Sequence, residues 1–97
     1  MELFSAVRKI GKADHRDALT ISDTATELTL STGKKSIEIR VTGNNTVYYG
    51  GKNVNSSNGI PLRKREMKIW NNCQKSFSVY LVCESGKTSE VRVVEYA

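Results

Sequence analysis

The sequence predicts an all-β domain: an antiparallel β-sandwich of six to seven short strands, jelly-roll-like or Ig-like, preceded by an N-terminal arm. Two observations predict this class. From residue 18 onward, apolar and polar residues alternate in short runs, and turn signals separate the runs at intervals of about 8–12 residues. The 97 residues allow one domain with a thin core, and a hydrophobic content of 38% suits a small β domain rich in turns.

The first seventeen residues are expected to form an arm or a short helix, and residues 18–97 the sandwich domain. Four apolar residues in the arm are spaced to share one side of a helix, which Gly11 would end. Two interpretations stay open: a flexible arm, or an arm that packs on a neighbouring subunit. The apolar residues of the arm are Leu3, Phe4, Val7 and Ile10.

The first three predicted strands span residues 18–22, 26–30 and 36–41. The third is the clearest, since Ile37, Ile39 and Val41 point to one side and the charged residues between them to the other. The polar segment 31–35 contains a glycine, which predicts a hairpin between the second and third strands.

The next strand, 46–50, leads into an unusual connection. Gly50-Gly51 is followed by a polar link with a single apolar residue, Val54, and the chain turns again at Asn58-Gly59. No acid, base or nucleophile in this link is arranged for chemistry, so the segment indicates architecture. The alternation leaves open whether Val47 and Tyr49 face inward, or Tyr48 alone.

Three further strands are expected at 67–70, 77–84 and 89–96. The segment 77–84 is apolar on both faces, which is typical of a central or covered strand, and it places Cys83 as a reduced thiol in the core. In the last strand Val91 and Val93 are expected inside. Glu90 and Arg92 are expected to face water, with Glu95 as a further candidate for that face.

The charge distribution marks one stretch of the chain. The net charge is +5, and residues 63–75 carry five cationic side chains against the single acid Glu66. Such a cluster is either a solvated loop and strand edge, or a patch that meets an acidic partner surface or nucleic acid. The cationic residues are Arg63, Lys64, Arg65, Lys68 and Lys75.

The residues that usually carry catalysis are sparse. His15 is the only histidine and lies in the N-terminal segment, and Cys73 and Cys83 lack metal-ligand spacing, although a disulfide between them stays open. We therefore expect no enzyme activity, no cofactor and no metal. No apolar run is long enough to cross a membrane, and the N-terminus lacks the apolar segment of a signal peptide, which indicates synthesis in the cytoplasm.

The segment from Val47 to Leu62, with the end of the chain, resembles small virion proteins of tailed bacteriophages and prophages. There a strand ends in Val-Tyr-aliphatic-Gly-Gly, a polar link with one Val follows, and Gly-apolar-Pro-Leu and a Glu come next. Tyr49 departs from the aliphatic residue, and Arg63-Lys64-Arg65 stands where Pro-Gly is common. The matching residues are Val47, Tyr48, Gly50, Gly51, Val54, Ser57, Gly59, Ile60, Pro61, Leu62, Glu66 and Val91 to Glu95.

This resemblance implies a non-enzymatic phage structural protein located in the virion and made in the host cytoplasm. A head-associated role is favoured, as a decoration or head-fibre protein that binds the capsid surface as a homo-oligomer, with a trimer as one form. A tail or head–tail joining component is an alternative. A basic β-barrel that binds nucleic acid is the less favoured alternative. The expected partner-binding residues are Leu3, Phe4, Val7, Ile10, Arg63, Lys64, Arg65 and Lys68.

Overall fold

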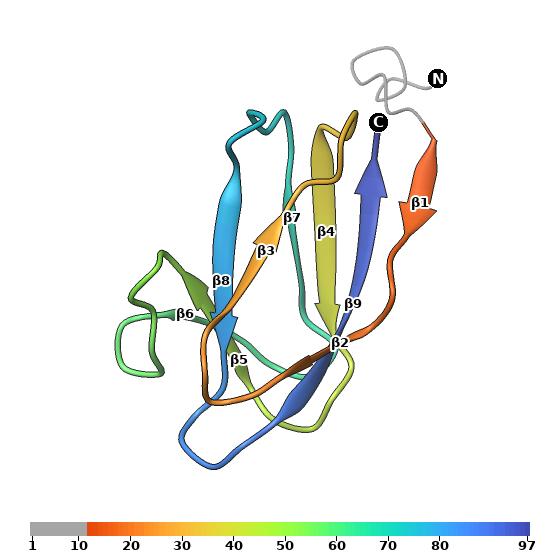
Figure 1. Ribbon diagram of the computed structural model, residues 1–97. Coiled ribbons are helices and arrows are strands. Elements are labelled where there is room, and N and C mark those ends of the chain that lie inside the picture. Colours follow the sequence, from red (N-terminus) through yellow and green to blue (C-terminus); the bar gives the residue numbers. More distant parts are fainter. Residues whose placement is uncertain (1–11) are drawn as a thin grey trace.

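The computed structural model describes residues 12–97, which form antiparallel strands in two facing sheets (Figure 1). The predicted all-β sandwich is confirmed, but the expected count of six to seven strands is wrong, because nine are present in this part of the chain. The strands are β1 (Ala13–His15), β2 (Leu19–Ile21), β3 (Thr26–Thr29), β4 (Ser36–Val41), β5 (Val47–Gly50), β6 (Ile60–Leu62), β7 (Met67–Trp70), β8 (Ser78–Val82) and β9 (Ser89–Tyr96).

The strand order decides between the two sandwich types. Sheet A has the order β1-β9-β4-β7, with β2 also paired to β9, and sheet B has the order β3-β8-β5-β6. From β2 onward the strands pair from the outside inward: β2 with β9, β3 with β8, β4 with β7 and β5 with β6. This is one long hairpin wound across two sheets, which is the jelly-roll arrangement and not the Ig-like one.

The two strands that the sequence did not predict are short and lie at sheet edges. Residues 13–15 fall in the segment 1–17 expected as an arm, yet they form β1 by pairing with the end of β9, so the sandwich begins before residue 18. Strand β6 pairs with β5 and contains Pro61, which an edge position tolerates. The arm residues Leu3, Phe4, Val7 and Ile10 lie outside the described residues.

The core lies between the sheets and follows the alternation of the sequence. Ile37, Ile39 and Val41 of β4 face Val91 and Val93 of the neighbouring β9 in the interior, as predicted. On β5 the structure settles the open choice, since Val47 is buried and Tyr49 packs against the core. The buried cluster comprises Ile21, Leu28, Ile37, Ile39, Val41, Val47, Leu62, Val79, Leu81, Cys83, Val91 and Val93.

Glu95 is buried, contrary to its candidacy for the exposed face. Glu95 lies two residues after Val93 on β9, so its side chain points to the same inner face, and it is 2% exposed. The backbone N–H and the hydroxyl of Ser31 donate to its two carboxylate oxygens at 2.7 and 2.8 Å. The guanidinium of Arg16 lies 3.4 Å away. A carboxylate with three such partners can be held in the interior, so Glu95 closes one end of the sandwich.

The connection between β5 and β6 folds back over the outer face of sheet B. Val54 is 9% exposed, and Val82, on the outer face of the central strand β8, is 4% exposed. Both residues line one hollow beside this loop. Gly59 makes the close approach feasible, because a Cβ there would lie 2.7 Å from Val54 and 2.8 Å from Tyr48. On the outer face of β8, Val82 is thus buried beside the loop, while Tyr80 stays half-buried.

Candidate functional site

The basic segment Arg63–Glu66 forms a tight turn between β6 and β7, where the chain crosses from sheet B to sheet A (Figure 1). The N–H of Glu66 donates to the carbonyl of Arg63 at 2.9 Å, and the Glu66 carboxylate accepts from the N–H of Arg63 at 2.7 Å. Arg65, at the third position, has φ of 74°. A positive φ there with an ordinary φ at Lys64 defines a type II turn, in which glycine is the favoured third residue.

The turn is anchored to the end of β4. The N–H of Arg65 donates to the carbonyl of Val41 at 2.7 Å, and the N–H of Val41 donates to the carbonyl of Glu66 at 3.0 Å. The guanidinium of Arg40 donates to the carbonyl of Arg65 at 2.9 Å. The three cationic side chains of the turn are all exposed, so the backbone bonds hold their positions and leave the charged groups in solvent.

Two arginines from distant parts of the sequence join this turn. Arg40 of β4 and Arg92 of β9 lie directly opposite each other on the outer face of sheet A, and both are exposed. Lys64 reaches the turn between β4 and β5, where its ammonium donates to the side-chain oxygen of Asn44 at 2.8 Å. We call the group formed by Arg40, Arg63, Lys64, Arg65 and Arg92 the basic corner.

Glu90 forms an ion pair with one arginine of the basic corner. Glu90 lies 3.5 Å from Arg92 and accepts a hydrogen bond from the Thr42 hydroxyl at 2.7 Å. The hydroxyl, followed by the nearby Arg92, lowers the pKa of Glu90 below its ordinary value. Within residues 12–97, the side chains of Arg63 and Arg65 have no hydrogen bond or ion pair.

Lys68, which the sequence grouped with Arg63 to Arg65, lies elsewhere. Lys68 lies opposite the buried Ile39 of β4, so its side chain projects from the inner face of the edge strand β7. The Lys68 ammonium lies 5.7 Å from the ring centroid of Trp70. Trp70 in turn packs edge-to-face on Tyr49, with ring centroids 5.3 Å apart, and tilts against Phe77. Lys68 therefore covers an aromatic cluster at the edge of the core and is not part of the basic corner.

A hollow of about 420 Å³ on the outer face of sheet A adjoins the basic corner. Its lining includes Arg40, Arg92 and Glu38, together with the end of β1 and the segment 16–18 that connects β1 to β2. His15, the residue considered for catalysis, is exposed at this rim. The hollow is open and carries charges of both signs, which suits contact with another macromolecule more than enclosure of a small substrate.

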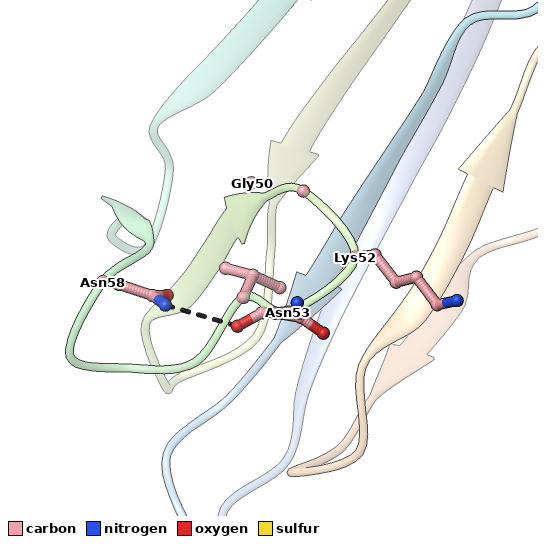
Figure 2. A pocket seen from close by; sticks show the side chains of 6 residues that line it. Gly50, Lys52, Asn53 and Asn58 are labelled. Atoms are coloured by element: carbon pink, nitrogen blue, oxygen red, sulfur yellow. Dashed lines mark hydrogen bonds between the residues drawn. The ribbon is translucent and has the colours of Figure 1, made fainter.

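A second hollow of about 420 Å³ lies in the connection between β5 and β6, and Figure 2 shows its lining. The side chain of Asn58 points toward Asn53 and donates to its backbone carbonyl at 3.3 Å, whereas Lys52 extends away from them. Asn55 accepts from the N–H groups of Ser57 and Asn58 at 2.8 and 3.0 Å. The asparagines of this loop thus hold the loop itself together, which agrees with an architectural role.

The described residues hold little else that could carry chemistry. Cys73 and Cys83 are free thiols, and burial raises the pKa of each. No group of three or more His, Cys, Asp or Glu side chains in residues 12–97 is placed to hold a metal ion. In the same range the chain forms no helix of the length and apolarity needed to cross a bilayer.

Three of the five residues of the basic corner, Arg63, Lys64 and Arg65, were predicted from the sequence, and Arg40 and Arg92 were missed. The sequence showed only that Arg40 and Arg92 occupy outward positions of predicted strands, and it did not indicate that they lie together. Their proximity depends on the pairing of β4 with β9, and a period-two pattern says nothing about which strands are neighbours. Comparison of the chain with protein-family models, with curated proteins and with solved structures gave no match.

Proposed function

We propose that this chain is a non-enzymatic structural protein of a tailed-bacteriophage particle, attached to the head as a decoration or head-fibre protein. The proposal is supported by what the residues of the resemblance do in the fold. Val47 and Leu62 are buried opposite each other, while Gly59 admits Val54 and Pro61 occupies an edge strand. Together they build the β5–β6 hairpin, the innermost pair of the jelly roll.

The observation that carries the proposal is this jelly roll built from the residues that carry the resemblance. Jelly rolls are frequent in viral capsid proteins, although the same architecture also occurs in lectins and enzymes. A particle component needs a compact domain that withstands proteolysis and a surface that contacts a repeated partner. Contact at many equivalent sites would add avidity, and a homo-oligomer would increase the surface that a thin-cored chain buries.

The decisive experiment is to ask whether the chain is part of purified particles. Particles induced from a host that encodes the chain are banded on a density gradient, and mass spectrometry compares them with particles from a strain in which the gene is deleted. We expect stoichiometric recovery with the wild-type particles and resistance to washing at moderate salt. Immunogold labelling then separates a head from a tail position. Absence from particles of normal composition would refute the proposal.

The oligomeric state has its own measurement. Size-exclusion chromatography with light scattering on the full chain distinguishes a monomer from a dimer or trimer, and a homo-oligomer is the expected result. A variant that lacks residues 1–10 tests the arm predicted from Leu3, Phe4, Val7 and Ile10. Loss of the oligomer with an unchanged melting temperature would assign the contact to the arm, whereas unfolding of the variant would show that the arm belongs to the core.

A further inference from the structure

We propose that the basic corner is a docking surface for a carboxylate-rich protein surface, and that it is shaped for binding at the expense of stability. Its residues come from three places in the chain: β4, the β6–β7 turn and β9. This inference deepens the proposed function, on which it rests for the identity of the partner as a particle protein. The recognition of carboxylates itself follows from the geometry of the corner.

Two local rules of stability fail at the same place in the basic corner. Arg65 adopts φ of 74° without being glycine, a conformation that is unfavourable for a side chain with a Cβ. Arg40 and Arg92 are like charges directly opposite on neighbouring strands, which is a destabilising cross-strand pair. Unfavourable features that gather at one surface point to function, because selection for stability alone would remove them.

The charged groups of the turn are carried by a backbone that is held in place. The backbone of the turn is bonded to Val41 on both sides, so the turn is rigid, while the side chains of Arg63 and Arg65 are unpaired within residues 12–97. Guanidinium groups on a rigid frame present forked donors that match carboxylates. Because the backbone is already ordered, binding has to order only the arginine side chains and not the turn that carries them.

The residues around the basic corner favour a protein partner over nucleic acid. Met67, 41% exposed, lies opposite Arg40 on the same outer face, and its sulfur is 3.2 Å from the Arg40 guanidinium. Arginine and methionine are enriched in protein interfaces. A single-strand binder stacks bases on exposed aromatics, yet Trp70 is packed against Tyr49 and Phe77 away from this face.

The test is a peptide titration of the full chain at low salt, monitored by two-dimensional NMR of the backbone amides and the arginine side chains. The probe is a peptide of alternating glutamate and alanine, with a glutamine–alanine peptide as the uncharged control. We expect saturable shifts at Arg40, Arg65 and Arg92 with the acidic peptide, and their loss as salt is raised. Arg40→Gln and Arg92→Gln should each weaken binding roughly two- to fivefold. Lys87→Gln removes the same charge from the exposed turn between β8 and β9 and should leave affinity unchanged.

Arg65→Gly gives the sharpest result because its two readouts move in opposite directions. Glycine relieves the positive φ, so the melting temperature should rise by about 2–5 °C, while affinity for the acidic peptide falls roughly two- to fivefold. Unchanged affinity in this variant, or an equal loss in Lys87→Gln, would overturn the proposal. Tighter binding of a single-stranded oligonucleotide at the same residues would overturn it in favour of nucleic acid.

The outcomes also separate this inference from the proposed function. If the chain is recovered in particles but the acidic peptide shifts no residue of the basic corner, the docking surface is refuted and the particle role stands. If the peptide binds at the corner but the chain is absent from particles, the docking surface stands and its partner is a protein outside the virion.

Discussion

Replacement of Gly59 by alanine tests whether the loop between β5 and β6 is clamped onto sheet B. The new Cβ would lie 2.7 Å from Val54 Cγ2, 2.8 Å from Tyr48 Cβ and 3.0 Å from the carbonyl oxygen of Asn55. Tyr48 is fixed in β5, so the loop must move. That movement strains or breaks the hydrogen bond from the Gly59 N–H to the Asn55 carbonyl, now 2.9 Å long.

The expected cost follows from these contacts. Overpacking by one methyl group typically destabilises a packed site by about 1–3 kcal/mol, and the lost hydrogen bond adds about 0.5–1.5 kcal/mol. The smaller entropy of alanine in the unfolded chain returns about 0.4–1 kcal/mol. With the middle of each range, we expect Gly59→Ala to lower the free energy of unfolding by about 2 kcal/mol, or the melting temperature by roughly 8–16 °C.

Urea and thermal unfolding followed by circular dichroism measure this change. Gly51→Ala is the matched control, because a Cβ there meets nothing within 4 Å, and it should change stability by less than about 0.5 kcal/mol. The double variant Gly59→Ala/Val54→Ala should lose less stability than the sum of the losses in the two single variants, since the nearest clash is gone. A Gly59→Ala protein as stable as the wild type would show that the loop is not clamped and that its glycine has another role.

Three further predictions concern the ends of the sandwich and its ionisable groups. Glu95→Ala should lower the free energy of unfolding by about 2–4 kcal/mol, because it leaves buried donors unpaired. Glu95→Gln should lower it by less, since one acceptor oxygen remains. Urea unfolding measures both changes. Thr42→Val should raise the pKa of Glu90 toward its ordinary value, as read by NMR titration, since the Thr42 hydroxyl is the main cause of its lowering. A thiol reagent should modify Cys73 in the native protein and Cys83 only after unfolding, because Cys83 is 3% exposed.

The lowered pKa of Glu90 also sets the sign of a pH effect. The folded-state pKa lies below that of the unfolded chain, so ionised Glu90 stabilises the fold above its unfolded pKa, and this contribution disappears as pH falls through the lowered value. Acid unfolding of the Thr42→Val protein should therefore show a smaller loss from this group than the wild type. An unchanged pKa of Glu90 in the variant would show that the hydroxyl is not the cause.

The alternation of side chains was readable because it is a local property of extended backbone. Successive residues of a strand point to opposite faces, so Ile37, Ile39 and Val41 had to share one side, whatever they paired with. The same rule should have placed Glu95 inside with Val91 and Val93. Its charge argued against burial, and the partners that permit burial, Ser31 and Arg16, are 64 and 79 residues away in the chain.

Local alternation predicted the class of fold and the inward side of five residues that the structure buries: Ile37, Ile39, Val41, Val91 and Val93. The strand order emerges from the folded chain, since β1 pairs with the far end of the chain, where Ala13 lies opposite Tyr96. Pairing depends on packing summed over the whole sandwich, which no local pattern encodes. For this reason the basic corner, which needs Arg40 and Arg92 side by side, became visible only in the folded chain.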